Sequence, residues 1–114
     1  MAYHAVRLAL QVMPNTNTTP AYTVPAQLAG LTPITATIVR HIILTNNDNA
    51  DHPVTVYVID STGSTYQVVS NTVLKKNDFL AIPLFLVLNP GEGIGAYSDV
   101  LDVMSWTASG VELT

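Results

Sequence analysis

The sequence ITATIVRHIILTNNDNADHPVTVYVI, which occupies residues 34–59, contains the strongest strand signals of the chain. Residues 34–45 form a long run that is rich in β-branched side chains, and residues 54–59 form a shorter run that alternates more cleanly. The eight residues between them, 46–53, are mainly asparagine, aspartate and proline, which favour turns. Two β-type runs on either side of a polar loop predict a β-hairpin.

The alternation of the first run predicts which face of this strand is buried. One face is apolar apart from Arg40, and the other face is mixed. The apolar face consists of Ile34, Ala36, Ile38, Ile42 and Leu44, and the mixed face consists of Thr35, Thr37, Val39, His41, Ile43 and Thr45. A strand of this kind suits a sheet whose outer side is covered by a neighbouring element.

The N-terminal residues 2–13 predict a half-buried strand, because apolar and mixed positions alternate there. The predicted buried face consists of Val6, Leu8, Leu10 and Val12, and the other face of Ala5, Arg7, Ala9 and Gln11. Residues 14–20 contain two prolines and no large apolar side chain, so they predict a loop.

The rest of the chain is typical of short strands separated by turns. Residues 22–26 predict an edge strand, because Pro25 cannot donate to a ladder, and Pro83 predicts a bulge or an edge position between Phe79 and Leu88. Closing strands are expected up to the C-terminus, with Ser109 and Gly110 forming a bulge. About eight strands and no helical periodicity predict an all-β fold, a single antiparallel β-sandwich or jelly-roll-like domain over residues 1–114.

Composition restricts the classes of partner. Only 11% of the 114 residues are charged, against roughly 25% in an ordinary soluble domain, while 48% are hydrophobic. Four scattered cations and a net charge of −4 give no basic patch, so we expect no nucleic-acid partner. No apolar run reaches the roughly 20 residues that span a bilayer, and residues 1–7 do not resemble a signal peptide, so we expect no membrane partner. The low charge favours a subunit partly covered by other subunits; the alternative is a monomer kept soluble by Thr, Ser and Asn.

The residue types that carry chemistry are present without a recognisable catalytic pattern. His41, Asp48, Asp51 and His52 would need to converge to hold zinc, and their spacing matches no common zinc motif. Residues 46–51 are rich in oxygen ligands, so calcium is an alternative, although the spaced acidic pattern of a dedicated calcium loop is absent. The remaining carboxylates lie in or beside turns. We therefore predict no enzymatic activity, no cofactor and no metal.

Aromatic side chains offer a further alternative. Exposed aromatic rings would stack on sugars in a carbohydrate-binding face, whereas buried rings would pack the core. The rings in question belong to Tyr3, Tyr22, Tyr57, Tyr66, Tyr97 and Trp106.

Several segments resemble small all-β virion proteins of tailed bacteriophages. The resemblance begins at YTVPA (residues 22–26), continues through ATIVRHIILTN (36–46) and VTVY (54–57), and extends to LVLNPGEGI (86–94) and SGVEL (109–113). It covers roughly residues 21–114, whereas residues 1–19 lie outside it. These motifs describe turns and strands, so no catalytic residue is carried over.

The resemblance implies a structural role in the virion. The first hypothesis is a capsid decoration (cement) protein, made in the host cytoplasm, that binds the capsid exterior and stabilises the assembled head. Its expected partners are the major capsid protein or other virion subunits, and we expect a homo-oligomer. The alternative is a neck, tail or fibre module that binds another virion protein or a host glycan. Residues 1–20 are the expected docking arm, with contact residues Tyr3, His4, Arg7, Pro14, Asn15, Pro20 and Tyr22.

Overall fold

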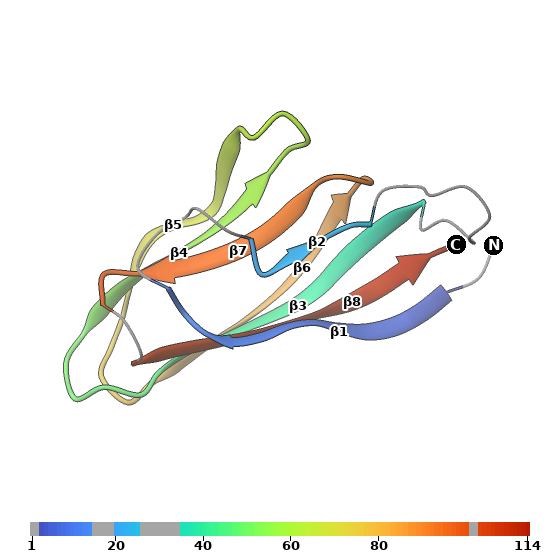
Figure 1. Ribbon diagram of the computed structural model, residues 1–114. Helices are drawn as coiled ribbons and strands as arrows, with labels where there is room; N and C mark the ends of the chain where they lie inside the picture. The colour runs from blue at the N-terminus through green and yellow to red at the C-terminus, as the bar shows by residue number, and fades with distance from the viewer. Residues whose placement is uncertain (1–2, 15–19, 26–34, 101–102) are drawn as a thin grey trace.

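The described residues form eight strands in two layers (Figure 1). The computed structural model describes residues 3–14, 20–25, 35–100 and 103–114. The strands are β1 (Tyr3–Val12), β2 (Tyr22–Thr23), β3 (Ala36–Asn46), β4 (His52–Ile59), β5 (Thr65–Leu74), β6 (Phe79–Leu88), β7 (Gly93–Ser98) and β8 (Met104–Leu113). This confirms the predicted all-β fold.

The strand order is that of a jelly roll. Sheet A has the order β1-β8-β3-β6, and sheet B has the order β2-β7-β4-β5. Strand β1 pairs with β8, β2 with β7, β3 with β6, and β4 with β5. This is the pairing of one long antiparallel hairpin that is folded over into two layers. The antiparallel pairs β3–β8 and β4–β7 then close the two sheets.

The predicted hairpin over residues 34–59 is wrong. Strand β3 lies in sheet A and pairs with β6 and β8, whereas β4 lies in sheet B and pairs with β5 and β7. The polar residues between the two strands therefore cross from one layer to the other. Composition predicted the turn chemistry of this connection correctly, but composition does not distinguish a reversal within one sheet from a crossing between two.

The core lies between the layers. Its largest fully buried side chains include Trp106, Ile42, Leu44, Leu88 and Ile94. The indole N–H of Trp106 donates a 2.9 Å hydrogen bond to Oε1 of Gln11, so the buried ring has a partner for its one polar atom.

Two bulges at the same level of sheet A change which residues face the core. Strand β8 is flanked by β1, which has one extra residue at Leu8, and by β3, which has one extra residue at Arg40. Both extra residues lie beside the β8 segment 108–110. A one-residue insertion moves every following side chain to the other face of the sheet.

A single alternation along each strand is therefore wrong: the prediction fails after the bulge on β1 and before the bulge on β3. On β1, Val6 and Leu8 face the core, but Leu10 and Val12 point outward and are 61% and 53% exposed. On β3, buried Thr37 and Val39 precede the bulge, whereas Ile42 and Leu44 are buried after it. The predicted bulge at Ser109–Gly110 has the correct level, but it lies in the two neighbouring strands, and β8 itself is continuous.

Gly110 makes this arrangement possible. A Cβ atom at this position would lie against the carbonyl oxygen of Ile38, well inside van der Waals contact, and close to Cα of Val39. The obstacle is backbone on a central strand, so no side-chain rotation relieves it.

We predict that Gly110→Ala destabilises the protein by roughly 1–3 kcal/mol, the usual cost of overpacking a well-packed interior. Urea unfolding followed by circular dichroism measures this difference. Ser109→Ala on the outer side of the same strand is the matched control and is expected to change stability by less than about 0.5 kcal/mol. Equal unfolding midpoints for Gly110→Ala and the wild type would contradict the close approach.

Candidate functional site

Two regions of the described residues have features beyond those of an ordinary core. They are a polar corner around His52 and the outer face of sheet A. Within residues 3–14, 20–25, 35–100 and 103–114, no three or more His, Cys, Asp or Glu side chains are placed to hold a metal ion, and no pocket is present. The same residues contain no helix that is long and apolar enough to span a membrane.

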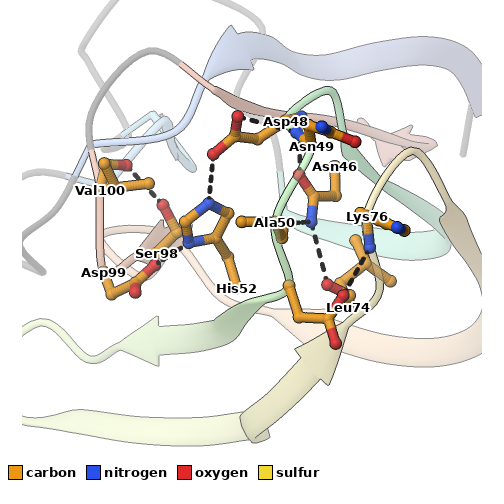
Figure 2. A network of polar contacts seen from close by, with 11 residues as sticks. Asn46, Asp48, Asn49, Ala50, His52, Leu74, Lys76, Ser98, Asp99 and Val100 are labelled. Carbon is orange, nitrogen blue, oxygen red and sulfur yellow. Dashed lines mark hydrogen bonds and ion pairs between the residues drawn. The ribbon is translucent and has the colours of Figure 1, made fainter.

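The polar corner is centred on the imidazole of His52, the first residue of β4 (Figure 2). Its Nε2 lies 2.6 Å from Oδ2 of Asp48, and its Nδ1 lies 2.9 Å from Oδ1 of Asp99. Asp48 follows β3 of sheet A, whereas Asp99 follows β7 of sheet B. A neutral imidazole has one N–H, and only the protonated ring donates to both carboxylates. When it is protonated, His52 therefore donates to carboxylates that follow strands of both layers.

The pKa shifts in the corner have the same cause. The hydrogen bond to Asp48 raises the pKa of His52, opposed by partial burial and assisted by the nearby charge of Asp99. In turn, the hydrogen bond from His52 lowers the pKa of Asp48, as does the backbone N–H of Asn49. Each group thus stabilises the charged form of the other.

The rest of the crossing loop is held by its own side chains. Buried Asn46 donates from Nδ2 to the carbonyl oxygens of Ala50 and Leu74, and its Oδ1 accepts from the N–H of Asp48 at 2.9 Å. Asp51 accepts a hydrogen bond from the backbone N–H of Lys76. Side-chain oxygens of Asn46, Asp48 and Asp51, which suggested calcium, thus contact separate partners within the protein.

Only two of the four residues considered for zinc come together. Asp48 and His52 are in contact, whereas Asp51 points to the β5–β6 turn. His41 lies in the middle of β3, opposite Pro83 on one side and Ser109 on the other. Asp99 was the missed member of the corner, since its contact with His52 depends on the β7–β4 pairing and not on sequence spacing.

Tyr22 is one of the residues predicted for docking, and its hydroxyl is used inside the sandwich. It donates to Oε2 of Glu112 at 2.7 Å and lies 2.9 Å from Oγ1 of Thr37. This contact links β2 in sheet B to β3 and β8 in sheet A. Burial, together with the Glu112 carboxylate, raises the pKa of Tyr22 to about 12.

The other predicted docking residues have varied positions. Tyr3 and His4 begin β1, opposite Leu113 and Glu112 of β8. The carbonyl oxygen of Pro14 accepts a hydrogen bond from the N–H of Ser98, and Pro20 is half buried. Asn15 lies outside the described residues. Among these residues, Arg7 is the one whose described side chain is exposed on a sheet face.

The outer face of sheet A carries six of the nine large hydrophobic side chains that are exposed among the described residues. We define it by its exposed large side chains, which are Leu10, Val12, Ile43, Phe79, Phe85 and Val87. The register places these residues on one four-stranded surface: Leu10, Thr107, Ile43 and Ala81 form one row, and Val12, Ser105, Thr45 and Phe79 form the next. Strand β6 contributes most, because its outward side chains are all apolar and Phe85 is 68% exposed.

The charges on this face have one sign. Both arginines of the chain, Arg7 and Arg40, are exposed at its outward positions, and the Arg40 guanidinium lies 5.7 Å from the centre of the Phe85 ring. The other described outward positions of the four strands carry no carboxylate. This face could not be predicted from the sequence, because the residues of an apolar run do not show which strand contains an extra residue.

Comparison with known proteins gives little further information. The chain matches no known protein-family model, and no curated protein sequence matches it. Among solved structures, a chain of the T13 IBDV viral particle is similar, with 14% sequence identity and a TM-score of 0.45. The match covers 97% of the present chain, which spans about 30% of the length of that viral chain.

The tyrosine hydroxyls give a prediction about stability. Tyr22→Phe removes two hydrogen bonds and leaves Glu112 without its partner, so we expect a loss of about 1–2 kcal/mol. Tyr57→Phe is the matched control. Tyr57 is buried and its hydroxyl has no partner among the described residues, so this substitution is expected to preserve or increase stability. Urea unfolding of both variants measures the difference, and a larger loss for Tyr57→Phe would contradict these assignments.

The corner predicts a pH dependence of stability. The raised pKa of His52 means that its contribution is fully present below about pH 6.5, its ordinary pKa, and is lost as pH rises through the folded-state value. The lowered pKa of Asp48 means that its contribution is present above its ordinary pKa of 3.8 and is lost as pH falls through the folded-state value. The corner therefore stabilises the fold most between these two ordinary values.

Thermal unfolding of the wild type and His52→Gln from about pH 5 to pH 9 tests this dependence. We expect the difference in Tm to be largest at the acidic end of this range and to decrease as pH rises. His41→Gln removes a histidine outside the corner and serves as the control. A difference in Tm that does not change with pH would show that His52 is not charged in the fold.

Proposed function

We propose that this protein is a structural virion subunit, specifically a capsid decoration protein of a tailed bacteriophage that binds the exterior of the assembled head and stabilises it. The observation that supports this proposal most directly is the apolar outer face of sheet A. A strand such as β6, which is apolar on both sides, is typical of sheets that are covered on both faces. Its outward side is uncovered in the single chain, so a partner is expected there.

The jelly-roll strand order is consistent with this role, because viral capsid domains are among the proteins built on this arrangement. Stabilisation needs no catalytic group. A subunit that binds the assembled shell and not its dissociated parts shifts the equilibrium toward the shell by mass action. Association between copies of the subunit would strengthen this effect, so a homo-oligomer on the particle remains part of the proposal.

The alternative, a tail or fibre module that binds a glycan, has less support from the aromatic side chains. Tyr57 and Trp106 are buried, Tyr22 is hydrogen-bonded between the sheets, and Tyr97 is half buried against Tyr57. Tyr66 on β5 is well exposed, but the described residues place no second exposed tyrosine or tryptophan beside it. A single ring gives a weak stacking platform.

We predict that Phe85→Ser weakens binding to heads by at least about tenfold without destabilising the fold, because this ring is exposed in the free subunit and buried in the complex. Tyr66→Ser is the matched control, since it removes a similarly exposed ring from sheet B. Heads prepared without the subunit are incubated with each variant, and the bound protein and the temperature of head disruption are measured.

Equal binding of Phe85→Ser and the wild type would exclude the outer face of sheet A as the contact. If particles lacking the subunit have sturdy heads but adsorb poorly to cells, the protein is an adhesin and not a decoration protein.

A further inference from the structure

We propose that the outer face of sheet A docks on a shell-protein surface that combines apolar side chains with carboxylates, and that Arg7 and Arg40 pair with these carboxylates. This inference rests on the proposed function, because it specifies the chemistry of the partner that the subunit binds.

Docking through a strand edge is disfavoured at all four edges of the sandwich. In sheet A, β1 is interrupted by the bulge at Leu8, and β6 contains Pro83, which has no N–H to donate. In sheet B, β2 has two residues, and β5 is irregular where Asn71 has a positive φ of 46°. Because each edge is short, bulged or lacks a donor, a partner is more readily accommodated on a face.

The size of the face is suitable for a specific complex. Its four strands have 10 or 11 residues each, which corresponds to a sheet roughly 33 Å long and about 19 Å wide. The resulting projected area of roughly 600 Å² approaches the area of about 800 Å² per partner that stable interfaces bury. Side-chain relief increases the true contact area beyond this projection.

The charges identify the partner. Both ion pairs found among the described residues involve His52, so neither arginine has a carboxylate partner there. Arginines that lack partners at an apolar interface are suited to bidentate binding of carboxylates. Arg40 is also partly positioned by its contact with the Phe85 ring, which lowers the cost of ordering it on binding.

The same charges disfavour face-to-face packing with a second copy. Such a dimer would bring four arginines into one interface to which the described residues contribute no carboxylate. Like charges in contact at an interface cost several kcal/mol. The partner surface is therefore of a different kind, with negative charge where this face has positive charge.

The register also indicates how the carboxylates of the partner are spaced. Arg7 pairs with Ser109, which pairs on its other side with His41, the neighbour of Arg40. The two arginine-bearing strands are thus separated by one strand, or roughly 10 Å. Two carboxylates about this far apart would contact both arginines at once.

Charge reversal tests the pairing. Arg40→Glu is expected to reduce binding to heads prepared without the subunit by at least roughly tenfold, because the introduced carboxylate faces like charge at an interface. Lys75→Glu is the matched control, since it makes the same change in charge at an exposed position of the β5–β6 turn. Equal effects of the two variants would show that only net charge matters and would overturn the inference. Arg7→Glu, compared in the same way, provides a second variant.

Cross-linking identifies the partner atoms. Arg40→Lys keeps the charge and introduces an amine, which a carbodiimide couples to a carboxylate in direct contact. We expect a cross-link on the particle between this lysine and an Asp or Glu of another virion protein. Cross-links from this lysine only to a second copy of the chain, or its failure to react while the variant is bound, would overturn the inference.

Failure of the inference is distinguishable from failure of the proposed function. Mass spectrometry of purified particles shows whether the subunit is present at all. Absence from the particle contradicts the proposed function. Presence on the particle, with Arg7→Glu and Arg40→Glu bound as tightly as the wild type, contradicts the inference alone.

Discussion

The close contact between Gly110 of β8 and the backbone of β3 allows the two bulges of sheet A to lie at one level. It lies where both neighbours of β8 carry an extra residue, Leu8 on one side and Arg40 on the other. A straight strand between two bulged strands requires a position where the chains approach without a side chain in the way. The bulges in β1 and β3 each switch which alternate residues face the core, and they do so at the same level. Sheet A therefore keeps one buried face along its whole length.

This constraint also determines what the outer surface looks like. Beyond the bulges, Leu10 and Val12 point away from the core that their alternation predicted for them, and Ile43 of β3 lies in the same row as Leu10. In the same region, the all-apolar strand β6 forms the edge of the sheet. An ordinary two-layer sandwich would place polar side chains at these positions. The outer face of sheet A is thus a consequence of backbone register, and its composition is that of a covered surface.

The sequence predicted that the elements are strands. It did not predict which strands pair, or which residues of β1 and β3 face the core. Strand locations followed from β-branched runs and turn residues, which act over a few positions. The bulges depend on packing against β8. In a run of apolar residues, either alternation places apolar side chains on both faces of the sheet, so the sequence does not show which face is buried. Two local signals were present. Arg40 interrupts the apolar face of its run, and Gly110 interrupts the last strand. Both marked the level of the irregularity without showing which strand contained the extra residue.

The two regions differ in how their charges are balanced. In the corner, His52 contacts both Asp48 and Asp99, which balance the charge of the ring when it is protonated. On the outer face of sheet A no carboxylate of the described residues balances the arginines in this way, although the chain as a whole carries a net charge of −4. An uneven distribution of this kind orients a protein as it approaches a charged surface. In the proposed complex, apolar area would supply the affinity once water is excluded, and the charges would select the partner.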